Sequence, residues 1–362
     1  MRTKLFQLWD NLLGHGEAAV TVPPLDGALQ PNHQLDETSS RYPLVDVDSL
    51  VTLGNELYAS SGKEIFKFQS NRGWHRYKQF YADIASIAAT NDGGLVVALV
   101  TGEVYIEGGN FDGSSYQLGE KYNCITAVVV SETDIFVAHG SEDNAFDEWQ
   151  RDLLERRASG SIWRINKLSG EKTLLANKLA YPAGLIVEED ALVFSEAWRH
   201  RLVRVSLKDP EFHEILYSDL PGYPGRLAHA NDGYWLAVFA PRSQLVEYVL
   251  REKKYRSRMM SEISPSCWIA PKLRSGQHFY EPLQGGGVKQ LGVLKPWAPT
   301  MSFGLCVRLN SNFQPIYAFH SRADGHTHGV TDMVEISGNL YVAARGDDVV
   351  VSISHQEFGG EG

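Results

Sequence analysis

The stretch Ile84-Ala-Ser-Ile-Ala-Ala89, Gly94-Leu-Val-Val-Ala98, Glu103-Val-Tyr-Ile106 contains three apolar runs separated by short polar turns. Each run has the length of a β-strand, and the turn Asn91-Asp-Gly-Gly94 carries the residues that hairpins with positive φ require. We therefore predict three antiparallel strands here. Related units at 48–68 and 330–353 follow the same order, which indicates an internal repeat.

The spacing of this repeat predicts the number of copies. Gaps between the second runs of successive units are 38, 40, 58, 41 and 106 residues, and a propeller blade takes about 40–50 residues. We therefore predict an all-β, six-bladed β-propeller with a long insertion between blades 5 and 6 and a charged loop at 142–157 in the 58-residue gap. Strong helical periodicity between the runs is mostly absent, which disfavours a doubly wound sheet. The six second runs are anchored at Tyr58, Val96, Phe136, Phe194, Trp235 and Tyr341.

One propeller domain is expected, spanning residues 37–353. Residues 1–36 are predicted to hold an N-terminal helix and a closing segment, with 18–22 as the strand that joins the last blade and protects its edge. The insertion at 243–299 is rich in Gly, Pro and Trp in its second half. It is either a lid over a pocket or a loop fixed to the rim. Residues 354–362 are a tail.

Composition excludes several classes of partner. The chain has 362 residues with 34 basic and 44 acidic side chains, a net charge of −10, which argues against nucleic acid or an anionic membrane surface as the main partner. No apolar run approaches the ~20 residues of a membrane span, and no signal-peptide core is evident, so we expect a cytoplasmic protein. Three cysteines are too few for a disulfide framework or a zinc cluster. Serine-hydrolase elbow, phosphate-loop and dinucleotide motifs are missing.

Several motifs resemble those of the strictosidine synthase-like family: Ser159-Gly-Ser-Ile-Trp-Arg-Ile165, Val193-Phe-Ser-Glu-Ala197 and Leu220-Pro-Gly-Tyr-Pro224. That family shares a six-bladed propeller with gluconolactonases and paraoxonases. The resemblance is densest over 123–240 and resumes at 328–353. It implies the fold but no single activity, because the fold hosts synthases, lactonases and other proteins.

The resemblance also shows where the chain departs from metal-dependent relatives, which hold calcium on the propeller axis. Asp48 and Asn123 resemble two of the ligand positions, but the fourth and fifth blades read Ala183-Gly184 and Pro224-Gly225-Arg226 where the relatives carry oxygen ligands. Calcium takes six to eight oxygens, and a guanidinium beside the site repels it. We therefore predict no axial calcium and no other cofactor.

The synthase branch uses a catalytic glutamate in the last blade. In this chain the resemblance places Thr331 at that position. A hydroxyl cannot replace a carboxylate as the base that condenses an amine with an aldehyde. Condensation of the strictosidine synthase type is therefore disfavoured.

If the innermost strands start at the same end of the axis, six side chains point into one tunnel mouth. Asp48 and Arg226 would then form a charge pair, which offsets the cost of burying Arg226. The pair either plugs the axis or takes part in chemistry. In the second case Arg226 replaces the metal as an electrophile, and Asp48 or His328 activates water. The expected ring is Asp48, Ser86, Asn123, Ala183, Arg226 and Thr331.

Two further groups of residues are candidates. His320, His326 and His328 suggest a transition-metal site, but no carboxylate at fitting spacing completes it, so we assign no metal ligand and ordinary loop histidines remain the alternative. The aromatic candidates either contact ligand or belong to the core. The ligand-binding set is Asn123, Tyr181, Tyr223, Trp297 and Thr331.

The leading hypothesis for function is hydrolysis of a lactone or similar ester, with sugar-derived lactones among the substrates considered. The alternative is a non-catalytic propeller that binds a small anionic ligand or a protein partner. Whether the protein is an enzyme, which substrate it takes and its oligomeric state stay open at this stage.

Overall fold

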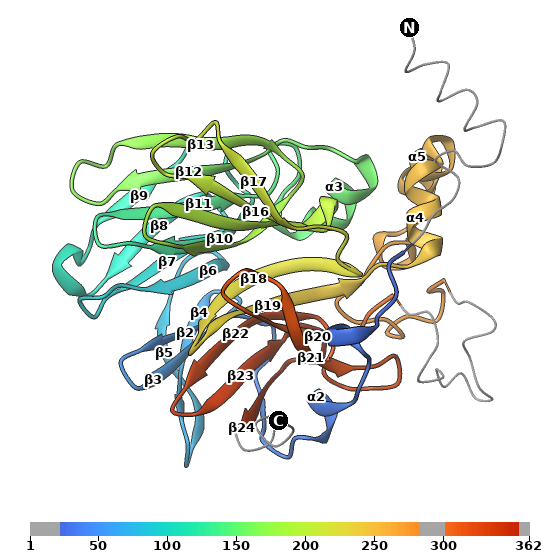
Figure 1. Ribbon diagram of the computed structural model, residues 1–362, viewed down its shortest axis with the longest axis horizontal. Coiled ribbons are helices and arrows are strands. Elements are labelled where there is room, and N and C mark those ends of the chain that lie inside the picture. The colour runs from blue at the N-terminus through green and yellow to red at the C-terminus, as the bar shows by residue number, and fades with distance from the viewer. Residues whose placement is uncertain (1–21, 120, 283–300, 355–362) are drawn as a thin grey trace, which may run out of the picture.

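A computed structural model describes residues 22–119, 121–282 and 301–354. In these residues 24 strands form six four-stranded sheets that follow one another around a common axis (Figure 1). The first three sheets are β2 (Val47–Leu53), β3 (Glu56–Ser61), β4 (Glu64–Gln69) and β5 (Gly73–Gln79); β6 (Ile84–Ala89), β7 (Leu95–Leu99), β8 (Glu103–Glu107) and β9 (Ser115–Gln117); β10 (Ile125–Val130), β11 (Asp134–His139), β12 (Gly160–Asn166) and β13 (Lys172–Leu179).

The last three sheets repeat this meander of antiparallel strands. They are β14 (Pro182–Val187), β15 (Ala191–Glu196), β16 (Arg201–Ser206) and β17 (His213–Tyr217); β18 (Gly222–Ala230), β19 (Gly233–Pro241), β20 (Gly304–Leu309) and β21 (Pro315–Ser321); β22 (Val330–Ile336), β23 (Asn339–Ala344), β24 (Val349–Ser354) and β1 (Arg41–Pro43). Each first strand contacts the first strands of both neighbouring sheets, and β2 contacts β22, so the ring is closed. The predicted all-β, six-bladed propeller is confirmed.

All six anchor residues lie on the second strand of a blade. Because each blade contributes one anchor, their spacing predicted the correct number of blades. The predicted place of the insertion is wrong. It leaves the fifth blade after β19 and returns at β20, and these two strands pair with Val238 opposite Leu305. Spacing between second strands does not reveal on which side of the third strand an insertion lies, so only the pairing shows that it interrupts the blade itself.

The ring is closed by β1, whose residues Arg41–Pro43 pair with Val351–Val349 of β24. The strand predicted for this role, 18–22, lies outside the described residues except for Val22, as does the predicted N-terminal helix. A segment that precedes the first blade therefore closes the ring, as predicted, but this segment is 41–43 and lies later in the chain than the predicted 18–22. A strand of three residues carries too little alternation to be recognised in the sequence.

Helices gather beside one end of the propeller. The insertion forms α4 (Gln244–Arg251) and α5 (Lys253–Glu262), and the charged loop at 142–157 forms α3 (Trp149–Glu155), which contacts α5. All three lie on the same side of the ring in Figure 1. The apolar side chains Val246, Val249 and Leu250 of α4 are buried in one cluster with Tyr181, Tyr223 and Phe239 of the propeller.

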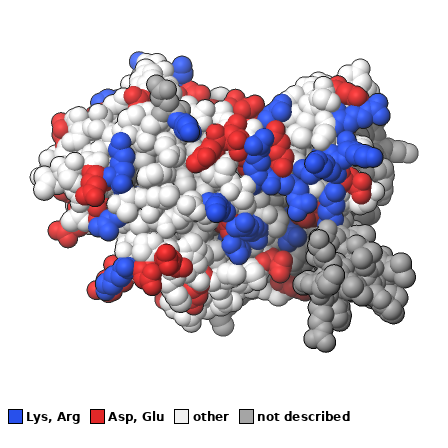
Figure 2. All heavy atoms as spheres, turned by 90° about the horizontal axis from the view of Figure 1, so that it is seen from above, with Lys and Arg blue, Asp and Glu red and all other residues white. Residues whose placement is uncertain are grey.

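Charge is distributed unevenly over the face of the molecule that Figure 2 shows. On the face seen in Figure 2 acidic and basic side chains are interspersed, and basic ones are more numerous toward the right of the view, where α4 and α5 lie in Figure 1. The net charge of −10 therefore does not make a uniform field. None of the helices in the described part of the chain has the length and apolar character needed to cross a membrane.

Candidate functional site

Every innermost strand has an irregularity in its pairing near its start. The breaks in register lie between Val47 and Leu50, Ile84 and Ser86, Ile125 and Ala127, Pro182 and Gly184, Pro224 and Leu227, and Val330 and Asp332. A bulged residue leaves the ladder, and its backbone groups are free to turn away from the sheet. Residues inside these breaks face the axis: Asp48, Ala85, Thr126, Ala183, Arg226 and Thr331.

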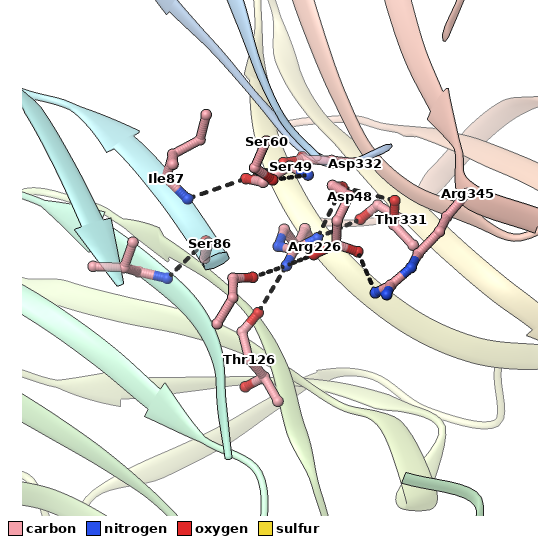
Figure 3. A network of polar contacts seen from close by, with 12 residues as sticks. Asp48, Ser49, Ser60, Ser86, Ile87, Thr126, Arg226, Thr331, Asp332 and Arg345 are labelled. Atoms are coloured by element: carbon pink, nitrogen blue, oxygen red, sulfur yellow. Dashed lines mark hydrogen bonds and ion pairs between the residues drawn. The ribbon is translucent and has the colours of Figure 1, made fainter. Parts of the chain in front are cut away.

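Arg226 is the side chain that connects the blades across the axis (Figure 3). From the fifth blade its Nη2 lies 2.6 Å from Asp48 Oδ2 and donates to the backbone oxygens of Ala85 at 2.5 Å and Thr126 at 3.2 Å. Its Nη1 donates to the backbone oxygens of Asp48 at 3.1 Å and Thr331 at 3.5 Å. One guanidinium thus binds blades 1, 2, 3 and 6, and its terminal N–H groups all point to protein oxygens.

Asp48 lies between two arginines. Its Oδ1 is 3.3 Å from Nη1 of Arg345, which also holds Asp46 at 2.7 Å, and its Oδ2 is the atom bound by Arg226. Burial by itself would raise the pKa of Asp48, but Arg226 and Arg345 lower it below its usual value. Asp48 is therefore an ionised, doubly bound carboxylate, and such a group is a weak base.

The surroundings also stabilise the charged form of Arg226. Burial alone would lower the pKa of Arg226, but the neighbouring carboxylates of Asp48 and Asp332 raise it above its usual value. The Asp48–Arg226 pair predicted from the sequence is thus formed and buried, with side-chain exposures of 7% and 10%. A pair of this kind is strongly destabilised when either partner is lost.

A second set of hydrogen bonds links neighbouring blades next to this pair (Figure 3). Asp332 accepts from Ser49 Oγ at 3.0 Å and from the backbone N–H of Leu50 at 2.9 Å, and Ser49 Oγ accepts from Ile87 N–H at 3.3 Å. Burial raises the pKa of Asp332 to about 6 despite the opposing effect of Arg226. This set connects blade 6 to blade 1 and blade 1 to blade 2.

The axial residues form the floor of a pocket of about 230 Å³. Apolar side chains form its walls, and they belong to residues outside the inner strands, including residues of α3 and of the insertion. Tyr181 stacks on Trp198 with 4.4 Å between ring centroids, and Trp198 donates through Nε1 to Asp152 at 2.7 Å, which fixes this wall. Burial raises the pKa of Asp152. The wall residues are Phe146, Trp149, Tyr181, Phe239 and Leu273.

Four members of the predicted ring line this pocket: Asp48, Ala183, Arg226 and Thr331. The positions predicted in blades 2 and 3 are wrong. Ser86 accepts a hydrogen bond from Val128 N–H of the next blade, and the axial residue is its neighbour Ala85. Asn123 precedes β10 and lines an adjoining cavity, while Thr126 takes the axial place. The bulges add a residue to each inner strand, so counting from a motif misses the register.

His328 is also misplaced by the sequence prediction. Its side chain is not among the pocket-lining residues and is 1% exposed. Its Nδ1 is paired with Ser302 Oγ at 2.9 Å and its Nε2 with the backbone oxygen of Arg322 at 2.7 Å. Both ring nitrogens are thus engaged in fixing a loop, which matches the ordinary alternative considered for these histidines.

Some of the predicted ligand-binding residues line the pocket and others do not. Tyr181 and Thr331 line the pocket, and Thr331 Oγ1 donates to the backbone oxygen of Asp48 at 2.7 Å. Tyr223 is fully buried in the apolar cluster and does not reach the pocket. Trp297 lies outside the described residues.

Two polar residues that line the pocket, Arg345 and Asp147, were not among the residues predicted from the sequence. Arg345 follows β23, and its side chain is 26% exposed. Its contacts with Asp46 and Asp48 use three N–H groups and leave two others. Asp147 lies in the short helix ahead of α3, and no hydrogen bond or ion pair of its carboxylate is found among the described residues. Neither residue belongs to an innermost strand, so the blade repeat contains no signal for them.

The oxygens at the axis do not suit a divalent cation. The carboxylate of Asp48 and the carbonyls of Ala85 and Thr126 already accept from a permanent cation, and a metal ion there would be repelled by it. Across the described ranges, no group of three or more His, Cys, Asp or Glu side chains could hold a metal ion. The donor set at the axis is thus built around a guanidinium.

Comparison with known proteins supports the fold alone. No family model and no curated protein matches the chain. Among solved structures, a gluconolactonase from Xanthomonas campestris has a TM-score of 0.52 at 11% identity, covering 89% of this chain and 88% of its own. The nidogen/laminin complex gives a TM-score of 0.42 at 13% identity, covering 53% of this chain and 72% of its own. The first likeness places the chain among proteins with the six-bladed propeller fold.

Proposed function

We propose that the axial pocket binds a small lactone or ester with an apolar body and hydrolyses it without a divalent ion. The proposal rests on the composition of the pocket: apolar walls and an axial floor, beside which Arg345 has two N–H groups and Asp147 a carboxylate for which the described residues supply no partner. The first is suited to stabilising an oxyanion and the second to accepting a proton from water. The fold shared with a gluconolactonase supports lactones as the first compounds to try.

The proposed reaction assigns a role to each polar group. Asp147 takes a proton from water, which attacks the carbonyl carbon, and the oxyanion that forms accepts hydrogen bonds from Arg345. The intermediate then breaks its acyl C–O bond, and Asp147 returns the proton to the leaving oxygen, so that lactone and water give a hydroxy acid. Arg226 and Asp48 act as positioning residues, because Asp48 holds both guanidiniums.

A panel of aliphatic, aryl-substituted and sugar-derived lactones, followed by acid release, tests the proposal. Turnover is expected to be unchanged by a chelator. Asp147→Asn should lower kcat about 10²- to 10⁴-fold, the usual contribution of a general base, with little change in the unfolding midpoint. Asp209→Asn, an exposed aspartate in the turn between β16 and β17, is the matched control. Equal kcat in Asp147→Asn and wild type would rule out the assigned base.

The second candidate is a non-catalytic propeller that binds a small anionic ligand. It is favoured by the state of Asp48, the buried carboxylate of the pocket, whose lowered pKa and two arginine partners make it a poor proton acceptor. Thermal stabilisation by a carboxylate ligand, without turnover of any lactone, would select this alternative.

Membership of the strictosidine synthase-like family belongs to the proposal too, and rests on the motifs at 159–165, 193–197 and 220–224. Condensation chemistry is not part of it. The resemblance puts Thr331 where that reaction requires a carboxylate, and the Thr331 hydroxyl donates to the backbone oxygen of Asp48.

A further inference from the structure

A second cavity adjoins the axial pocket and is the larger of the two, at about 330 Å³. Four residues line both: Asp48, Phe146, Asp147 and Arg345. The rest of its lining comes from loops and one strand end of the first three blades, including Asp83, Thr101 and Asn123. The two spaces therefore lie side by side, and a ligand longer than a simple lactone can reach from one into the other.

Arg345 and Phe146 lie where the two cavities meet, since both residues line each cavity. The guanidinium carbon lies 5.9 Å from the centre of the Phe146 ring, and the nitrogens are bound to Asp46 and Asp48. Two carboxylates and an aromatic ring therefore hold Arg345 in place where the cavities meet. The carbonyl group proposed to lie against Arg345 would thus sit at the junction.

The two cavities differ in chemical character. The axial pocket is walled mainly by aromatic side chains, whereas the second cavity has polar side chains from several loops. Of its carboxylates, Asp46 is compensated by Arg345, and Asp48 by Arg226 and Arg345. Asp83 and Asp147 have no ion-pair partner in the part of the chain that the structure describes. The second cavity therefore carries uncompensated negative charge next to hydroxyl and amide groups.

We infer that the ligand has two parts, an apolar part in the axial pocket and a positively charged arm, such as a protonated amine, held by Asp83 in the second cavity. This inference rests on the axial pocket being the proposed binding site but does not depend on hydrolysis. Asp83 precedes β6 and has an exposed side chain, so it is open to a ligand and has no part in the proposed reaction. Asp83 is therefore proposed to favour ligands whose arm carries a positive charge.

Binding of two γ-butyrolactams, non-hydrolysable analogues of lactones, tests the inference by calorimetry at pH 7. They differ only in the end of a propyl arm, which is an amine in one and a hydroxyl in the other. An alkyl amine is protonated at this pH. Wild type is expected to bind the amine about two- to fivefold more tightly, the range of a partly exposed ion pair, and high salt should reduce this preference.

Asp83→Asn should reduce the difference between the two dissociation constants without weakening binding of the hydroxyl compound, whereas Asp209→Asn should leave the preference as in wild type. Equal affinities in wild type, or a preference that Asp83→Asn does not reduce, would overturn the charged arm alone. Failure of both lactams to bind would overturn the axial site with it. Turnover of the corresponding lactones, measured separately, reports on the hydrolysis proposal.

Discussion

Replacing Arg226 by methionine should destabilise the propeller strongly, because one side chain neutralises the axis and ties four other blades together. The change preserves much of the volume and removes the cation, leaving Asp48 in a buried position and the carbonyls of Ala85 and Thr126 without this donor. Breaking a buried ion pair by removing one partner costs about 3–5 kcal/mol. Since Arg345 still faces Asp48 at 3.3 Å, we expect the lower part of that range.

Urea unfolding followed by tryptophan fluorescence measures the loss as a change in the free energy of unfolding. Asp48→Asn in the Arg226→Met background removes the uncompensated carboxylate, and it should recover more than about 1 kcal/mol if that charge is the cause. Arg76→Met is the matched control. It breaks an arginine–glutamate pair with Glu64 whose arginine side chain is 63% exposed, and should cost less than about 1 kcal/mol.

Two results would refute this reasoning. The first is an Arg226→Met protein within 1 kcal/mol of wild type, which would show that the axial network contributes little to stability. The second is a double variant no more stable than the single one, which would show that the buried charge of Asp48 is not the source of the loss.

Lowering the pH should reduce the free energy of unfolding by more than protonation of the carboxylates would, because burial lowers the pKa of three histidines to about 4. These are His139, His320 and His328. Unfolding restores a pKa near 6.5, so the unfolded chain takes up these protons first and stability is lost as pH falls from about 6.5 toward 4. Urea midpoints across this range should show the loss, and a flat profile would contradict it. Gly184→Ala should destabilise the fold by about 1–3 kcal/mol, because a Cβ there would meet the backbone oxygen of Gly225 at 2.2 Å. A thermal midpoint equal to that of wild type would show that these two inner strands can move apart.

The number of blades could be predicted because it depends on local signals. Strand alternation and turn residues recur with each blade, and anchors such as Val96 and Phe136 mark second strands regardless of what surrounds them. The Asp48–Arg226 pair was predicted as well, since placing both residues at the starts of inner strands is enough to bring their charges together at the axis.

The rest of the site depends on features that leave no mark in the pattern of residues. A bulge shifts the register by one residue, so Ala85 rather than Ser86 faces the axis, and its contribution is a backbone carbonyl that any residue could supply. Arg345 and Asp147 reach the pocket from outside the inner strands, where the repeat has no fixed position.

The amino-acid sequence alone determined the architecture of this protein, because the alternation of strands and the chemistry of turns act over a few residues and repeat. Tertiary structure decided which blade contains the insertion, which segment closes the ring and which groups meet at the axis. Those outcomes depend on pairing between strands far apart in the chain and on the direction in which bulged backbone turns, and both become defined only when the sheets pack around a common centre.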